Sequence, residues 1–205
     1  MESQLIDPTH CPTSLPSFAV DAGSGVHTNP TVFPDEYLLE LQPVFVIRHP
    51  ALSFSSLLRH MNEFSVATIP WHLYTYRYTR LVYEWYLNRE GSSSAPTPYI
   101  TDGDDIMYNE SGLRRLCVLV GLDADELRLE WALDSRASYE MQARFHKSLN
   151  SSTRVLEGFG SEHLDMGQEA AKWGRDFTTE QAKLLEQAVQ TAMPDYEWLK
   201  LRSIR

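Results

Sequence analysis

Three residues that follow a short apolar run carry side chains suited to recognising or transforming an anion. Arg48 and His49 come directly after the run Val44–Ile47, and Ser56 stands eight residues beyond Arg48. A guanidinium supplies charge and a planar fork of donors, and a hydroxyl in a following helix can converge on the same phosphate or carboxylate. His49 is a candidate acid or base, because imidazole gains and loses a proton near neutral pH. The alternatives are a structural ion pair for Arg48 and a helix-start hydrogen bond for His49.

An aromatic stretch over residues 71–86 is the most unusual part of the chain. At helical spacing it has two faces, of which the larger and more apolar is expected to pack on the body of the protein. The second face presents His72, Tyr76, Thr79 and Tyr83. Aromatic walls with hydroxyl or imidazole tips are typical of a pocket for an apolar molecule with a few polar groups. The alternative is a helix packed on both sides, with its tyrosine hydroxyls satisfied internally.

The acidic cluster of Asp102, Asp104 and Asp105 has two interpretations. Clustered oxygen ligands suit Mg²⁺. Acidic residues around a single glycine between a strand and a helix are also ordinary turn and capping chemistry. The second interpretation is favoured, and we expect no metal site.

These residues are positioned by a predicted alternation of strands and helices. Val44–Ile47 is an uninterrupted β-rich run of the buried parallel type, and Pro50 suits the first turn of a helix that continues to about residue 64. A long helix is predicted over Trp71–Arg89 and a second short strand over Pro98–Thr101. Both strands run into helices, as in α/β proteins.

The second half of the chain is predicted to be mainly helical. Helical patterns cover residues 111–120, 123–133 and 138–149, and Asn109 is placed to cap the first. The last helix begins at Thr178 with a capping-box pattern and is expected to end before Pro194. The predicted fold class is therefore α/β, a small parallel sheet flanked by many helices. Residues 1–34, rich in Pro, Ser, Thr and Gly, are expected to form an extended N-terminal arm, and residues 35–205 the α/β domain.

The composition is that of an ordinary globular protein. The 205 residues are 42% hydrophobic and 22% charged, and the apolar runs fall far short of the roughly 20 residues that span a bilayer. The first thirty residues do not match a secretory signal, and Cys11 and Cys117 are too few for a disulfide framework. We therefore expect a cytoplasmic protein with no membrane contact. A formal net charge of −10 opposes binding to a phosphate backbone, so no nucleic-acid partner is expected.

The segment 44–56 resembles the 3′-phosphate motif of sulfotransferases: a strand, an arginine, often a proline two residues later, and a serine eight residues after the arginine. Arg48, Pro50 and Ser56 hold those places. Residues 99–122 look like the later strand-and-helix block of fungal sulfotransferase-like proteins. The resemblance covers about residues 29 to 200 and implies a P-loop NTPase fold, with Arg48 and Ser56 on the 3′-phosphate of the donor.

One departure from that family concerns the start of the chain. Sulfotransferases hold the 5′-phosphosulfate end of their donor with a cationic turn rich in Gly, Ser and Thr, after their first strand. The nearest candidate, residues 18–25, has no cation and places Asp21 where it would repel a phosphate. We therefore expect a sulfotransferase-like domain that is truncated at the N-terminus and lacks the phosphate-binding loop.

The expected function is the cofactor-independent conversion, by cyclisation, dehydration or rearrangement, or the binding, of a largely apolar natural-product intermediate. The resemblance points to fungal secondary metabolism. The alternatives are a PAPS-dependent sulfotransferase and a non-catalytic accessory protein. We expect no cofactor and a small apolar metabolite as partner, and a homo-oligomer stays open. The candidate catalytic residues are His49, His72 and Tyr76. The candidate substrate-binding residues are Arg48, Ser56, Thr79 and Tyr83.

Overall fold

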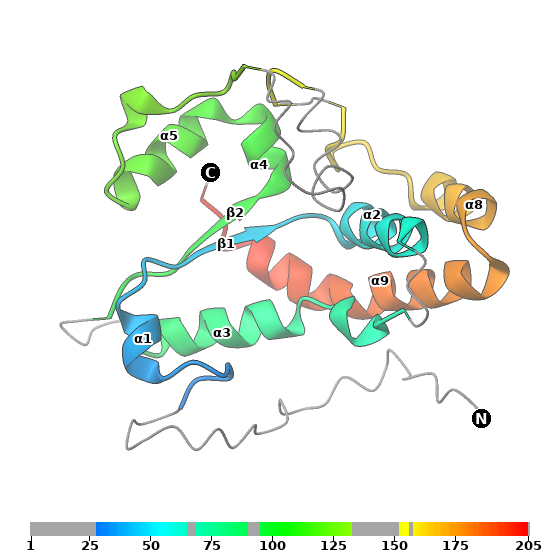
Figure 1. Ribbon diagram of the computed structural model, residues 1–205, viewed down its shortest axis with the longest axis horizontal. Helices are drawn as coiled ribbons and strands as arrows, with labels where there is room; N and C mark the ends of the chain where they lie inside the picture. Colours follow the sequence, from blue (N-terminus) through cyan, green and yellow to red (C-terminus); the bar gives the residue numbers. More distant parts are fainter. Residues whose placement is uncertain (1–27, 65–68, 90–94, 133–151, 156–157, 205) are drawn as a thin grey trace.

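The computed structural model describes residues 28–64, 69–89, 95–132, 152–155 and 158–204 (Figure 1). Within these residues the chain is an α/β fold with a two-stranded parallel sheet and seven α-helices, so the predicted fold class is confirmed. Most of the expected arm and the helix predicted over residues 138–149 lie outside the described residues. The α-helices are α1 (Asp35–Leu39), α2 (Pro50–Glu63), α3 (Arg77–Leu87), α4 (Gly103–Tyr108), α5 (Glu110–Leu119), α8 (Met166–Asp176) and α9 (Thr179–Lys200).

Both predicted strands are confirmed. Strands β1 (Val44–Ile47) and β2 (Tyr99–Asp102) run parallel with direct pairing from one end to the other. β-Branched and aromatic residues fill them, as suits a pleated and half-buried surface. Because the strands are parallel, their carboxyl ends lie at one edge of the sheet. The residues that follow them, Arg48 and Gly103, therefore meet there.

Helix α9 supplies much of the core. It packs against α2, α3, α8 and both strands, and in Figure 1 it lies below α2 with its C-terminal end close to the strands. The predicted capping box between Thr178 and Gln181 is present. The expectation that this helix ends before Pro194 is wrong, since it continues to Lys200. Pro194 is exposed and removes only one backbone donor, whereas the last turns bury Tyr196 and Leu199 completely enough to hold the helix in place.

The aromatic stretch is not one helix. The structure has a 3₁₀ turn, η1 (Trp71–Leu73), and α3 begins only at Arg77. Tyr74 and Tyr76, which lie between the two elements, are both buried in the core. The hydroxyl of Thr75 accepts a hydrogen bond from the Arg77 amide at 3.0 Å and so starts the new helix. The helix is therefore interrupted between η1 and α3 because the side chains of Tyr74 and Tyr76 are buried in the core.

The region after α5 also differs from expectation. The cap at Asn109 is confirmed, because its side chain accepts from the Gly112 amide. The helix predicted over residues 123–133 is reduced to a 3₁₀ turn, η2 (Ala124–Glu126). Glu130 instead forms an antiparallel bridge with Arg154. Pairing with a distant segment thus replaced local helical preference. No helix in the described part of the chain is long and apolar enough to cross a bilayer.

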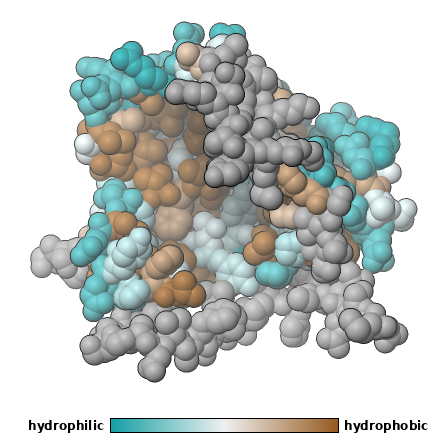
Figure 2. All heavy atoms as spheres, in the orientation of Figure 1, coloured by the Kyte–Doolittle hydropathy of each residue, from teal (hydrophilic) through white to brown (hydrophobic). Residues whose placement is uncertain are grey.

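One face of the sheet is apolar and exposed. Phe45, Ile47 and Ile100 belong to the core on the side of α9, whereas Val46 points the other way and is 61% exposed. Figure 2 shows hydrophobic residues gathered over α5 and the strands, around a hollow on this face. The exposed apolar residues of these elements and of the turn after α5 are Val44, Val46, Val118, Leu119 and Leu122.

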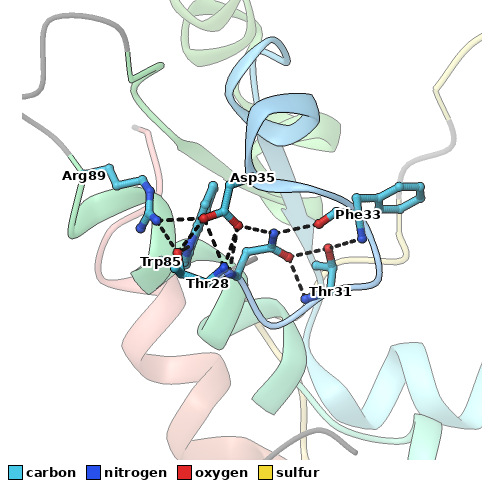
Figure 3. A network of polar contacts seen from close by, with 7 residues as sticks. Thr28, Thr31, Phe33, Asp35, Trp85 and Arg89 are labelled. Atoms are coloured by element: carbon cyan, nitrogen blue, oxygen red, sulfur yellow. Dashed lines mark hydrogen bonds and ion pairs between the residues drawn. The ribbon is translucent and has the colours of Figure 1, made fainter. Parts of the chain in front are cut away.

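A polar network ties the segment before α1 to the end of α3 (Figure 3). The Asp35 carboxylate accepts hydrogen bonds from Thr28 and Asn29, through backbone and side-chain donors, and pairs with Arg89 at 3.0 Å. The Arg89 guanidinium also lies 4.2 Å from the centre of the Trp85 ring. Burial favours the neutral acid, but these hydrogen bonds outweigh it and lower the pKa of Asp35 to about 2. Asp35 is therefore a structural anion.

Candidate functional site

Arg48 is held at the carboxyl end of β1 by a tyrosine from the aromatic stretch. The Tyr76 hydroxyl donates to the Arg48 carbonyl at 2.6 Å and accepts from the Arg48 amide at 3.1 Å. The Arg48 Nη2 donates to the Phe159 carbonyl at 3.0 Å. Its Nε is buried and has no hydrogen-bond partner among the described residues. A buried donor without a partner calls for an explanation, because such donors are normally satisfied.

A pocket of about 1010 Å³ lies beside Arg48. Its walls come from α2, α4, the segment 158–165 and α8, and they include both Arg48 and Ser56. The two residues singled out by the strand-and-helix motif are thus brought to one pocket. Its volume is at the upper end for small-molecule sites, so it has room for a nucleotide or a metabolite of similar size.

The pocket lining is mixed in character. Apolar side chains on it are Leu52, Ile106, Met107 and Leu164. Charged side chains are Arg48, Arg59, Lys172, Glu63, Glu162, Asp165 and Glu169. Glu169 is buried and pairs with Lys172, so part of this charge is neutralised within α8. The pocket therefore offers a ligand both an apolar wall and a fixed cation at Arg48.

The segment 158–161 lies against Arg48 and α4. Besides the bond from Arg48 to Phe159, the Gly158 amide donates to the Tyr108 hydroxyl at 2.9 Å. The Ser161 amide donates to the Asp104 carboxylate at 2.9 Å, and the Ser161 hydroxyl donates to the same carboxylate. Four hydrogen bonds thus hold this segment along one wall of the pocket.

The carboxyl end of β2 carries a buried carboxylate. Asp102 is 1% exposed and caps α4 by accepting from the Asp104 amide at 2.9 Å. It also accepts from the Tyr196 hydroxyl at 2.8 Å, and the Lys200 ammonium lies 3.7 Å away. Burial raises the pKa of Tyr196, and the bond to Asp102 adds to the rise. The acidic cluster thus joins α4 to α9. In the described ranges no group of three or more His, Cys, Asp or Glu side chains is arranged to hold a metal ion.

His49 lies beside Arg48 as the N-cap of α2. Its Nδ1 accepts from the Ala51 amide at 3.2 Å, and its ring meets the edge of Tyr196 with 5.4 Å between centres. Burial lowers the pKa of His49, and Lys200 lowers it further, against the opposing effect of Asp102. The imidazole is therefore neutral at physiological pH, with its proton on Nε2. This is the helix-start hydrogen bond that was the alternative to catalysis.

The second aromatic face does not assemble at this pocket. Tyr76 and Tyr83 are buried in the core, whereas His72 is exposed and Thr79 is half-buried. None of the four belongs to the pocket lining described above. Because α3 begins at Arg77, His72 and Tyr76 precede the helix on which Thr79 and Tyr83 lie, so they share no helical stripe.

Two walls of the pocket were missed by sequence reasoning. These are the segment with Phe159 and Ser161, and helix α8 with Glu169 and Lys172. The available signal for α8 was Asp165, whose side chain caps the amides of residues 167 and 168. No local pattern links Phe159 to Arg48, which is 111 residues away in sequence.

Comparison with known proteins finds relatives in fungi. The chain is 34% identical over 214 residues to a protein named sulfotransferase ppzF from Metarhizium majus, covering 94% of this chain and 62% of that protein. It is also 34% identical over 215 residues to a protein of the same name from Metarhizium rileyi, covering 95% of this chain and 63% of the relative. The chain therefore spans a little under two thirds of the length of these curated relatives. No family model and no solved structure matches it. The two relatives support a fungal sulfotransferase-like family for this chain.

Proposed function

We propose that this chain is a sulfotransferase-like protein of fungal secondary metabolism whose pocket binds a 3′-phosphorylated nucleotide of the PAPS type through Arg48 and Ser56. The buried and unmatched Nε of Arg48, at the wall of a pocket that also includes Ser56, carries the proposal. A phosphate would satisfy that donor and gain charge-assisted hydrogen bonds. The names of the two relatives are consistent with this ligand, and a P-loop NTPase fold is part of the proposal.

Calorimetry with adenosine 3′,5′-bisphosphate tests the nucleotide site. We expect micromolar binding to the wild type and a loss of at least tenfold in Arg48→Lys, because lysine keeps the charge but not the planar fork. Ser56→Ala should weaken binding by roughly 10- to 100-fold, about the value of one hydrogen bond to a charged group. Ser203→Ala is the matched control, since the Ser203 hydroxyl donates to the Lys200 carbonyl and Ser203 lies outside the pocket lining. Equal affinity in Arg48→Lys and wild type would contradict the proposal.

A second candidate function is the cofactor-independent conversion of a largely apolar natural-product intermediate. Its support is the apolar wall of the same pocket, together with a neutral His49 next to Arg48. Because Nδ1 is engaged by the Ala51 amide, the Nε2–H of the neutral imidazole would donate a hydrogen bond to negative charge that develops on a substrate. The residues that the sequence assigned to catalysis or binding on the aromatic stretch, His72, Tyr76, Thr79 and Tyr83, lie outside this lining, so in this proposal they would act indirectly, Tyr76 by holding the Arg48 backbone.

Turnover assays separate the two candidates. Purified protein is incubated with pathway intermediates, with and without PAPS, beside His49→Gln and a buffer control. Product that forms without PAPS and is reduced in His49→Gln supports cofactor-independent conversion, whereas sulfated product formed only with PAPS supports transfer. Intact nucleotide binding with no turnover would assign the chain an accessory role. We also propose that the protein is cytoplasmic and that it self-associates. Light scattering over a concentration series tests the self-association.

A further inference from the structure

The free Nε donor of Arg48 shares one edge of the guanidinium with Nη2, the nitrogen that is bonded to Phe159. In arginine the Nε–H and one of the two Nη2–H bonds point the same way, and a phosphate or carboxylate binds that edge with two parallel hydrogen bonds. Here the Nη2 donates to the Phe159 carbonyl at 3.0 Å, while the Nε has no partner among the described residues. A backbone carbonyl has one oxygen, so it engages Nη2 and leaves Nε unmatched.

We propose that the Phe159 carbonyl holds the place of a ligand oxygen, and that an anion binding both donors of Arg48 displaces it and releases the segment 158–161. This inference rests on the proposed function only in that the ligand enters at Arg48. An anionic acceptor forms stronger hydrogen bonds with a guanidinium than a neutral carbonyl does, so the exchange is favourable. Arg48 then serves both as the anion anchor and as a tether of the pocket wall.

The remaining tethers of the segment are few and polar. They are the bond from the Gly158 amide to Tyr108 and the bonds from Ser161 to Asp104. The Phe159 side chain is 56% exposed, so apolar burial contributes little to holding the segment in place. The neutral bond from Gly158 to Tyr108 is the weaker tether, and the two bonds to the Asp104 carboxylate are the stronger ones. The part of the segment nearest Arg48 is therefore held weakly enough for a ligand to shift.

Competition for one guanidinium edge has a thermodynamic consequence. If the segment and the anion exclude each other at Arg48, then weakening another tether of the segment must tighten anion binding. Tyr108→Phe removes the acceptor of the Gly158 amide, and Tyr108 is half exposed, so the fold should tolerate the change. We expect adenosine 3′,5′-bisphosphate to bind about two- to tenfold more tightly to this variant. Tyr37→Phe, an exposed tyrosine on α1, is the matched control and should not change the affinity.

Amide hydrogen exchange gives a direct readout of the release. Ligand binding should speed exchange in a peptide covering residues 158–164, because the amides of Gly158 and Ser161 lose their acceptors, whereas a peptide from α9 should not exchange faster. Slower exchange at residues 158–164 on binding, or unchanged affinity in Tyr108→Phe, would overturn the inference.

The two proposals can fail separately. If the nucleotide does not bind, inorganic phosphate at tens of millimolar replaces it as the probe of the Arg48 edge. Faster exchange with phosphate in the wild type, absent in Arg48→Lys, would support displacement of Phe159 while the nucleotide proposal falls. If phosphate does not change the amide hydrogen exchange at residues 158–164, the proposed displacement of the Phe159 carbonyl is wrong as well.

Discussion

At the scale of single residues, Tyr76 fixes the position of the Arg48 backbone at the end of β1. Its hydroxyl closes two hydrogen bonds on the backbone of Arg48, and its ring stacks on Phe54 with 5.8 Å between centres. Sequence reasoning assigned Tyr76 to catalysis. The contacts make it a positioning residue for Arg48, because they reach the Arg48 backbone while the ring lies in the core.

Replacing Tyr76 by phenylalanine should therefore lower stability and ligand affinity together. The Tyr76→Phe variant leaves the amide and the carbonyl of Arg48 without their side-chain partner, and we expect a loss of about 1 to 3 kcal/mol in the free energy of unfolding in urea. Tyr74→Phe is the matched control. The Tyr74 hydroxyl is buried with no partner among the described residues, so its removal should be neutral or stabilising. Equal effects of the two substitutions would show that the hydrogen bonds from Tyr76 to the Arg48 backbone contribute little to stability.

At the scale of elements, the polar network around Asp35 joins the start of α1 to the end of α3. These two elements are far apart in sequence. Five donors or charges from Thr28, Asn29 and Arg89 converge on one carboxylate. Because the pKa of Asp35 falls to about 2 from its usual 3.8, its contribution to stability is complete above about pH 4 and is lost as the pH falls towards 2.

Asp35→Asn should remove that contribution and its pH dependence. We expect the variant to lose about 2 kcal/mol of unfolding free energy at pH 7, which corresponds to a shift of nearly two pKa units. The gap between wild type and variant should narrow as the pH is lowered from about 4 to about 2, because the wild-type carboxyl then becomes protonated. Denaturant unfolding at several pH values measures this. Glu36→Gln, a neighbouring exposed position, is the control, and a gap that stays constant with pH would contradict the assignment.

At the scale of the whole molecule, the two faces of the sheet differ. Parallel sheets normally have both faces covered, yet Val46 is 61% exposed and Val118 on α5 is 66% exposed. Exposed apolar area of this kind contributes little to folding stability but is available for contact with another apolar surface.

Polar substitution on this face should therefore change surface behaviour and not stability. Val46→Thr combined with Val118→Lys should lower the fluorescence of bound anilinonaphthalene sulfonate, with a change in unfolding free energy of less than about 1 kcal/mol. Leu73→Lys, a single exposed apolar position on η1, is the control and should leave the fluorescence nearly unchanged. A large loss of stability in the double variant would mean that this face is packed in solution.

Local signals predicted where several strands and helices begin or end. The β-rich run before Arg48, the proline that starts α2, and the Thr178–Gln181 capping box all act within a few residues, so they can be found in the sequence alone. The same holds for the placement of Arg48 and Ser56, because a strand followed at once by a helix brings residues eight apart towards one end of the sheet.

Long-range contacts decided the rest, because their energy comes from partners that no local pattern specifies. Burial of Tyr74 and Tyr76 interrupts the helix predicted for the aromatic stretch. Burial of Tyr196 and Leu199 lets α9 continue beyond Pro194. Arg48 is hydrogen-bonded to the Phe159 carbonyl, 111 positions away in sequence, and to the Tyr76 hydroxyl, 28 positions away. The sequence by itself therefore determined which side chains stand at the end of β1, through local backbone preference. Only the tertiary structure decided that Arg48 faces a pocket with one donor unmatched, since that depends on which distant groups the packing brings to it.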